Sequence, residues 1–348
     1  MTIRQLNARS ILSSQGQETV EVWLQTTDAR EITASVPAGI SAGKYEVAKV
    51  PVAVALQQIE MVKEALVGRE LTQEEVDEVL GDKQMGGNAS LAVSAAAWKA
   101  GLNKTAVYEK WPRLFLLLFE GGEHGRESIA MQEFTIIENS VGQAVSDYAK
   151  LKSYLDGAGL ETKVEDGAEG GFSPVGFDDL RALSTIKEVF PQAQIALDAA
   201  GSFNGAGVDY ERMVNEFNIA SIEDPYSDED WGAWKDFYAK YKDRILVVGD
   251  DLTVTNVQRI EKALNPQVIN AVVIKPNQIG TITQAKRASE AAKKAGLKTV
   301  VSHRGDETDD DWIVDFALET GADFVKLGGM DRGERVAKYN RLRALGMK

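Results

Sequence analysis

The segments Ile245-Leu-Val-Val-Gly-Asp250 and Ala271-Val-Val-Ile-Lys275 decide the fold of this chain. Each is a short apolar run followed by an ionisable residue, Asp250 or Lys275. A helical pattern, Asn256–Leu264, lies between them. Apolar runs that alternate with helical stretches are typical of parallel βα units. Asp250 and Lys275 are then predicted at the carboxyl ends of neighbouring strands, where barrel enzymes carry their catalytic groups.

The same unit repeats from about residue 129 onward. The predicted strands are Ala130–Ile137, Glu161–Val164, Gln194–Leu197, Ile219–Ile222, Ile245–Val248, Ala271–Ile274, Lys298–Val301 and Asp323–Leu327. Eight strands in roughly 220 residues fit an α/β fold of the (β/α)8 TIM-barrel type. Six of the strands end in a titratable residue: Asp198, Glu223, Asp250, Lys275, His303 and Lys326. A closed barrel would gather these six side chains at one mouth.

The residues before the barrel have a different, α+β pattern. Predicted strands are Ile3–Leu12, Thr19–Thr27 and Glu31–Val36, and predicted helices are Val52–Leu66, Thr72–Leu80 and Ala89–Leu102. In the second strand Val20, Val22 and Leu24 alternate with polar or larger residues, as in a half-buried strand. We therefore expect an N-terminal α+β capping domain over residues 1–125 and a barrel domain over 126–348.

Composition excludes several classes of protein. The 348 residues carry 39 Lys and Arg against 53 Asp and Glu, so the net charge is −14, and there is no Cys. Such a charge disfavours a nucleic-acid or anionic membrane surface, and the absence of Cys excludes disulfides and thiolate metal sites. The longest dense apolar run, Leu114–Phe119, is too short to span a bilayer. We expect a soluble cytoplasmic protein.

Three carboxylates at consecutive strand ends predict a metal site. Any one of Asp198, Glu223 and Asp250 alone would be best explained as a solvated loop residue. Three that converge would repel one another strongly unless a cation were present. A set made only of oxygen ligands favours Mg²⁺.

The remaining candidates each have two explanations. Lys275 at the end of a buried strand is either a salt-bridge partner of the acidic cluster or a general base with a lowered pKa. Glu169 precedes two glycines. It is either part of a simple turn or a general acid that faces the metal across the mouth. Arg304 suits bidentate binding of a carboxylate or phosphate, or else a surface ion pair. A loop residue such as His124 is usually just exposed.

Several motifs together resemble the enolase (phosphopyruvate hydratase) family over nearly the whole chain. They are Val36-Pro-Ala-Gly-Ile-Ser-Ala-Gly43, Met131-Gln-Glu-Phe134, Glu169-Gly-Gly-Phe172, Ser221-Ile-Glu-Asp-Pro225, Gly249-Asp-Asp-Leu-Thr-Val-Thr-Asn256, Lys275-Pro-Asn-Gln-Ile-Gly280, Ser302-His-Arg304 and Glu334-Arg-Val-Ala-Lys-Tyr-Asn340. The chain is a shortened member by this comparison, most plainly between Asp198 and Glu223.

The resemblance implies a role for each candidate. As metal ligands it implies Asp198, Glu223 and Asp250 for a structural Mg²⁺, and Ser41 in a mobile loop for a second Mg²⁺. As catalytic residues it implies Lys275 as the base, Glu169 with Glu133 as the acid, and the loop residue His124. As substrate-binding residues it implies Lys326 for the carboxylate, Arg304 for the phosphate, and their neighbours Ser302, His303 and Gly305. It also implies a glycolytic enzyme that forms a homodimer or higher homo-oligomer.

The chain departs from the family pattern at several positions, including Ala168, where the family has Asp, and Gly333, where it has Ser. The family motif Ser-Arg-Gly-Asn-Pro-Thr reads Ser14-Gln-Gly-Gln-Glu-Thr19. The Ser expected after His-Arg is Gly305, which is followed by Asp306, so a hydroxyl donor is lost and a negative charge is gained.

Three functional hypotheses follow from these observations. The first is dehydration of 2-phosphoglycerate to phosphoenolpyruvate, and the second is the same enolisation on another phosphorylated, phosphonate or carboxylate substrate. The third is a catalytically silent scaffold, which would have no physical need for three converging carboxylates.

Overall fold

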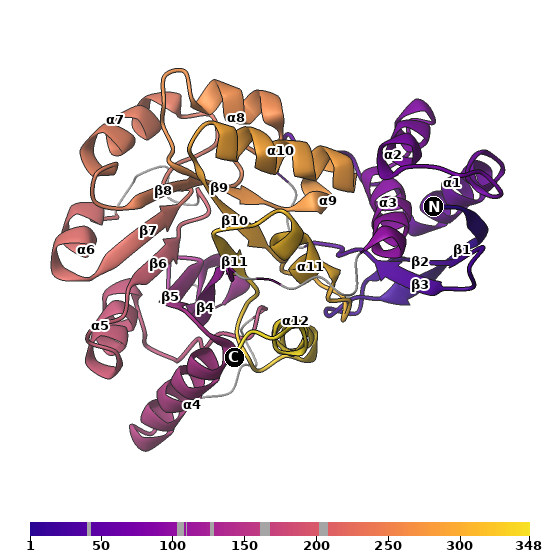
Figure 1. The fold of residues 1–348 in the computed structure, drawn as a ribbon. Coiled ribbons are helices and arrows are strands. Elements are labelled where there is room, and N and C mark those ends of the chain that lie inside the picture. Colours follow the sequence, from indigo (N-terminus) through magenta and orange to yellow (C-terminus); the bar gives the residue numbers. More distant parts are fainter. Residues whose placement is uncertain (40–42, 103–107, 109, 126–128, 161–167, 202–207) are drawn as a thin grey trace.

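The computed structural model describes the chain except for residues 40–42, 103–107, 109, 126–128, 161–167 and 202–207. It shows a small N-terminal domain beside a closed barrel (Figure 1). Among the described residues, no helix is both long enough and apolar enough to cross a membrane.

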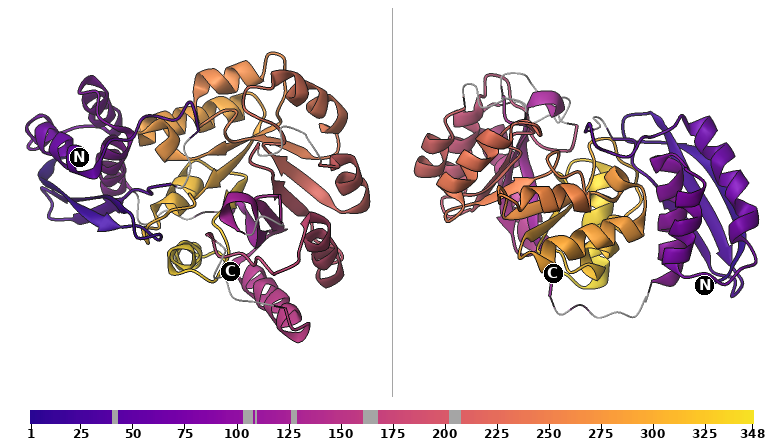
Figure 2. Two further views of the ribbon diagram at one scale, coloured as in Figure 1. Left: turned by 180° about the vertical axis from the view of Figure 1, so that it is seen from behind. Right: turned by 90° about the horizontal axis from the view of Figure 1, so that it is seen from above.

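The N-terminal domain is a three-stranded antiparallel sheet covered by helices. The strands are β1 (Ile3–Leu12), β2 (Glu18–Thr26) and β3 (Glu31–Ser35), and the helices are α1 (Val52–Leu66), α2 (Gln73–Asp82) and α3 (Gly87–Gly101). Thr72 caps α2 in a capping box with Glu75, as the sequence predicts. The Ala-rich α3 contacts β2 and β3 as well as the barrel helices α9 and α10, and its small side chains permit this close packing between two domains (Figure 2).

The barrel contains eight strands in the order β10-β11-β4-β5-β6-β7-β8-β9. Their bounds are β4 (Arg113–Glu120), β5 (Glu133–Glu138), β6 (Ile195–Asp198), β7 (Ile219–Glu223), β8 (Leu246–Gly249), β9 (Ala271–Ile274), β10 (Lys298–Ser302) and β11 (Phe324–Lys326). The predicted barrel is confirmed. Within it, a small cluster that includes Phe115, Val248 and Val300 is fully or almost fully buried.

Helices surround the strands (Figure 1). They are α4 (Val141–Gly157), α5 (Asp179–Val189), α6 (Tyr210–Glu216), α7 (Trp231–Tyr241), α8 (Val257–Ala263), α9 (Pro276–Ile279), α10 (Ile282–Lys294), α11 (Trp312–Glu319) and α12 (Gly333–Leu345). A 3₁₀ turn, η1 (Gly122–His124), follows β4. These helices cover the apolar outer faces of the strands, so the main core lies between the two layers.

The prediction was wrong about which strand comes first in the barrel and about the direction of β5. The barrel begins with β4, which precedes residue 126, and the predicted strand Glu161–Val164 lies outside the described residues. β5 runs antiparallel to both β4 and β6, although the βα pattern predicts parallel strands throughout. The described part of the β4–β5 connection contains only η1, and antiparallel neighbours need no helical crossover. This hairpin therefore gives no βα signal in the sequence.

Candidate active site

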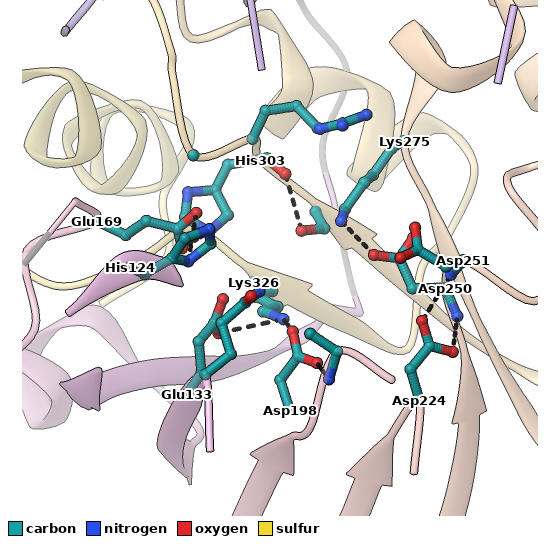
Figure 3. A pocket seen from close by; sticks show the side chains of 15 residues that line it. His124, Glu133, Glu169, Asp198, Asp224, Asp250, Asp251, Lys275, His303 and Lys326 are labelled. Atoms are coloured by element: carbon teal, nitrogen blue, oxygen red, sulfur yellow. Dashed lines mark hydrogen bonds and ion pairs between the residues drawn. The ribbon is translucent and has the colours of Figure 1, made fainter. Parts of the chain in front are cut away.

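A polar pocket of about 150 Å³ opens at the carboxyl ends of the parallel strands. Five of the six predicted strand-end residues line it: Asp198, Asp250, Lys275, His303 and Lys326. The sixth, Glu223, lies with Asp198 and Lys326 at a small adjoining cavity. The barrel thus brings the predicted residues together from strands that are far apart in the sequence. Figure 3 shows Lys275 and Asp250 on one side of the pocket, and Glu169, His124 and His303 on the other.

Lys326 lies at the centre of an acidic cluster. Its Nζ is 2.7 Å from Asp198 Oδ2, and 3.1 Å from carboxylate oxygens of both Glu223 and Glu133. The lysine is 3% exposed. Burial disfavours its charged form, but the three carboxylates outweigh this effect and raise the pKa of Lys326 well above its ordinary value. One buried ammonium group therefore holds together the ends of β5, β6 and β7.

Lys275 forms an ion pair with Asp250, the residue that follows β8. Gln278 donates from Nε2 to the other oxygen of Asp250 at 2.9 Å. Burial disfavours the ammonium form, but Asp250 outweighs it and raises the pKa of Lys275 above its ordinary value. The prediction of a lowered pKa is therefore wrong for this structure, because the nearest charge is a carboxylate in direct contact.

Asp224 is a buried residue that sequence reasoning left without a role. Its carboxylate accepts the N–H of Asp250 at 2.9 Å and the N–H of Asp251 at 2.7 Å. It also has a positive φ of 41°, which is rare for a non-glycine residue. Asp224 therefore orients the residues after β8. The adjacent acidic pairs Glu223-Asp224 and Asp250-Asp251 were the available signal.

Glu169 lies between two imidazoles. Its Oε2 is 3.1 Å from His303 Nε2, and its Oε1 is 3.5 Å from His124 Nδ1. Arg335 Nη1 lies 2.6 Å from His303 Nδ1. Because a guanidinium can only donate, Nδ1 must accept, and the proton of His303 is on Nε2, facing Glu169. Burial lowers the pKa of His303 to about 4, which keeps its ring neutral.

The two glutamates of the site have pKa values shifted in opposite directions. Burial, with the charges of Glu169 and Asp198, outweighs the opposing charge of Lys326 and raises the pKa of Glu133 well above its ordinary value. Burial also disfavours ionisation of Glu169, but His303, His124 and Arg335 outweigh it and lower its pKa. Environments that separate two carboxyl pKa values in this way identify an acid and its ionised partner. Of the two, Glu133 therefore binds a proton more readily than Glu169.

The other predicted residues are also located. His124 is buried, so the usual expectation of an exposed loop histidine is wrong. Ser302 donates to the carbonyl of His303 at 3.0 Å, and Gly305 lines the pocket. Ser41 lies outside the described residues.

Arg304 is 7% exposed and is not a surface ion-pair residue. Its guanidinium donates to Asn277 Oδ1 at 3.1 Å and to Glu46 Oε1 at 3.0 Å. Glu46 Oε1 also accepts the N–H of Gly43 at 3.1 Å. The arginine predicted to bind an anion thus pairs with a carboxylate from the segment after Ser41.

Glu120, at the end of β4, is a second residue that sequence reasoning missed. It is fully buried, and its carboxylate accepts the N–H groups of Glu169 and Gly171. It therefore fixes the backbone that carries Glu169. Burial and the negative charge of Glu169 raise the pKa of Glu120 to about 8. An ionisable residue at the end of a dense apolar run was the signal, as it was for the six recognised strand ends.

The shifted pKa of Glu120 predicts a pH-dependent stability. Its pKa rises from an ordinary 4.5 to about 8 in the folded protein, so between these values the folded state binds the extra proton. This stabilising contribution is complete below the unfolded pKa and is lost as the pH rises through about 8. The variant Glu120→Gln should gain stability relative to wild type as the pH rises from about 5 to about 8. Urea unfolding of both proteins across this range measures the difference; a difference independent of pH would contradict the shift.

The donor set fits a hard divalent cation. The pocket is lined by six carboxylates (Glu133, Glu169, Asp198, Asp224, Asp250 and Asp251) and by three basic side chains (Lys275, Arg304 and Lys326). Within the described residues, two groups of converging ligand atoms occur here: Asp224 with Asp250 and Asp251, and His124 with Glu133 and Glu169. The predicted triad is not one of these groups, because Asp198 and Glu223 pair with Lys326 and Asp250 pairs with Lys275. Excess negative charge on oxygen donors is the environment that such a cation neutralises.

Two family models and full-length relatives match the sequence of this chain. A model of the enolase N-terminal domain matches residues 3–109, and a model of the enolase C-terminal TIM barrel domain matches residues 205–346. A protein named enolase from Acidothermus cellulolyticus is 33% identical, and the match covers 98% of this chain and 93% of the relative. An enolase from Natranaerobius thermophilus is 34% identical, with 98% and 94% covered. This chain belongs to the enolase family.

As an enolase-family member, the chain is a phosphopyruvate hydratase-like lyase. The two family models leave out residues 110–204, which contain His124, Glu133, Glu169 and Asp198. The full-length relatives do extend over that region. Their alignments span 400 and 402 positions, more than the 348 residues of this enolase. Segments of the relatives therefore have no counterpart in this chain.

Proposed function

We propose that this enolase-type lyase reversibly dehydrates 2-phosphoglycerate to phosphoenolpyruvate with Mg²⁺. The observation that carries the proposal is the placement of Lys275 and the Glu169–Glu133 pair on opposite sides of one buried, acidic pocket (Figure 3). Loss of water from a β-hydroxy acid needs a base at the α-carbon and an acid at the hydroxyl group. This arrangement supplies both to one bound molecule.

The chain's own residues divide the proton transfers between them. Lys275 removes the α-proton in its neutral form, which requires Asp250 to release the ion pair that now favours the ammonium. On the other side, the Glu133–Glu169 pair donates the proton held on Glu133 to the departing hydroxyl. Glu120 and His303 keep Glu169 in position through its backbone and its carboxylate.

Asp198, Glu223 and Asp250 would hold the structural Mg²⁺. When bound, the ion supplies positive charge that stabilises the substrate carboxylate as the very weakly acidic α-proton leaves. In the same proposal Lys326 binds this carboxylate, and Arg304 with Ser302, His303 and Gly305 surrounds the phosphate. The second Mg²⁺ at Ser41 rests on the family resemblance alone.

The test is a spectrophotometric assay of phosphoenolpyruvate formation from 2-phosphoglycerate. We expect turnover in Mg²⁺, its loss after chelation, and its recovery when Mg²⁺ is added back. Circular dichroism of the same sample confirms the fold. Well-folded protein that gives no product at saturating Mg²⁺ would disprove the proposed substrate.

A second candidate is the same enolisation on another phosphorylated, phosphonate or carboxylate acid. Two observations favour it: Gly305 offers no hydroxyl donor, and Glu46 already pairs with Arg304. Solvent deuterium exchange at the α-carbon distinguishes the candidates, because it reports proton removal without requiring dehydration. Exchange on such an acid, with no turnover of 2-phosphoglycerate, would establish this alternative; no exchange on any acid would favour a silent scaffold.

The family also suggests a cellular setting. We propose a cytoplasmic, glycolytic enzyme that acts on a small acidic substrate and forms a homodimer or higher homo-oligomer. Light scattering coupled to size-exclusion chromatography measures the oligomeric state. A monomeric mass at assay concentration would disprove the proposed homodimer or higher homo-oligomer.

A further inference from the structure

Asp306 points away from the active-site pocket and toward the N-terminal domain. Its Oδ1 accepts the N–H of Gln15 at 3.0 Å and the hydroxyl of Ser14 at 3.3 Å. Asp306 is fully buried and is absent from the pocket lining, whereas its neighbours Arg304 and Gly305 line the pocket. Residues 14–19 and 305–306, two of the places where the sequence departs from the family pattern, are therefore in direct contact.

Further hydrogen bonds join the same two segments. Ser14 N–H donates to the carbonyl of Glu307 at 2.7 Å, and Ser14 Oγ accepts the N–H of Glu307 at 3.1 Å. Gly39 N–H donates to the carbonyl of Asp306 at 3.0 Å. The N-terminal domain thus holds the backbone of residues 306–307 at several points, across 292 positions of sequence in the case of Ser14 and Asp306.

The barrel holds the other end of this loop. Arg335 donates to the carbonyls of Arg304 and Gly305, each at 2.6 Å. Among the residues that the structure describes, no acceptor takes the N–H of Gly305. A pocket-lining residue with its carbonyl fixed and its N–H unused is suited to donate to an anion.

We propose that Asp306 is a positioning residue: through Ser14 and Gln15 it holds Arg304 and Gly305 where the anionic group of the substrate binds. This inference rests on the proposed function. The alternative is that the negative charge of Asp306 repels the anionic group of the substrate and weakens its binding. Within the described structure, Oδ2 of Asp306 is buried without a hydrogen-bond partner, so the residue is not explained by its contribution to stability. This supports a specific role for Asp306. A buried carboxylate oxygen without a partner costs stability.

Two substitutions of Asp306 distinguish positioning from repulsion. Asp306→Asn keeps an acceptor for Gln15 and removes the charge, whereas Asp306→Ala removes both. Positioning predicts that Asp306→Ala raises the KM for 2-phosphoglycerate about tenfold, with a much smaller change in kcat, while Asp306→Asn keeps the wild-type KM. Repulsion predicts a lower KM for both variants, and that result would overturn the inference.

The control is Asp310→Ala, which removes a different contact between the same domains. Asp310 accepts the N–H of Ser35 at 3.0 Å and pairs with Lys99 at 2.8 Å, but it does not line the active-site pocket. We expect it to lower the thermal midpoint without raising the KM. If Asp310→Ala raises the KM as much as Asp306→Ala does, the effect is general loosening of the domains and the inference fails.

A binding measurement separates this inference from the proposed function. Calorimetric titration of inorganic phosphate in Mg²⁺ buffer needs no turnover. Weaker phosphate binding by Asp306→Ala than by wild type and Asp306→Asn supports positioning even if 2-phosphoglycerate is not the substrate. Equal binding by all three proteins would overturn it even if wild type is active.

Discussion

Lys275→Ala is expected to slow proton removal strongly while leaving the metal site able to bind Mg²⁺. Its Nζ is the basic group that contacts Asp250 on the side of the pocket opposite Glu169. General bases contribute about 10²- to 10⁴-fold to rate, so the loss of solvent deuterium exchange at the α-carbon of 2-phosphoglycerate should lie in that range. Mass spectrometry of the recovered acid measures the exchange.

Two comparisons make this result specific. Asp250 retains the hydrogen bond from Gln278 in the variant, so calorimetry should still detect Mg²⁺ binding. Lys240→Ala removes an exposed lysine that pairs with Glu211 at 2.7 Å, and it should exchange like wild type. Exchange that persists at the wild-type rate in Lys275→Ala would remove this lysine as the base.

Lys326→Met is expected to destabilise the fold and to abolish activity together. The substitution leaves Asp198, Glu223 and Glu133 buried around a position with no compensating charge. Removing one partner of a buried ion pair typically costs about 3–5 kcal/mol, and urea unfolding in a metal-free buffer measures this loss. Activity should fall as well, because the proposed carboxylate ligand is absent.

Mg²⁺ should stabilise Lys326→Met more than it stabilises wild type, since binding to the folded state adds stability and the variant site has a greater excess of negative charge. Thermal unfolding with and without Mg²⁺ measures this difference. Lys298→Met is the matched control, because this lysine pairs with Asp323 at 3.0 Å on the exposed surface. A Lys326→Met protein as stable as wild type would show that the three carboxylates do not depend on this ammonium.

Most of the barrel could be predicted because its signal is local. Each of the strands β6 to β11 is a short buried run with a helix next to it in the sequence, and the ionisable residue at its end marks the mouth. The β4–β5 hairpin escaped prediction because its described connection has no helix, and the apolar run Leu114–Phe119 looks the same in a strand or a buried helix. Glu120, at the end of this strand, was therefore not among the predicted site residues, and its contact with the backbone of Glu169 was missed.

By itself, the sequence determined which chemical groups meet at the barrel mouth, because strand ends in a closed barrel must converge whatever the loops do. Only the tertiary structure decided their protonation and orientation. Lys275 has a raised pKa because Asp250, 25 residues earlier, contacts it. The pKa values of Glu133 and Glu169 shift in opposite directions because different partners surround the two residues. Asp306 faces Ser14 and Gln15 through contacts between distant segments. Such contacts depend on how the two domains pack, which no local pattern encodes.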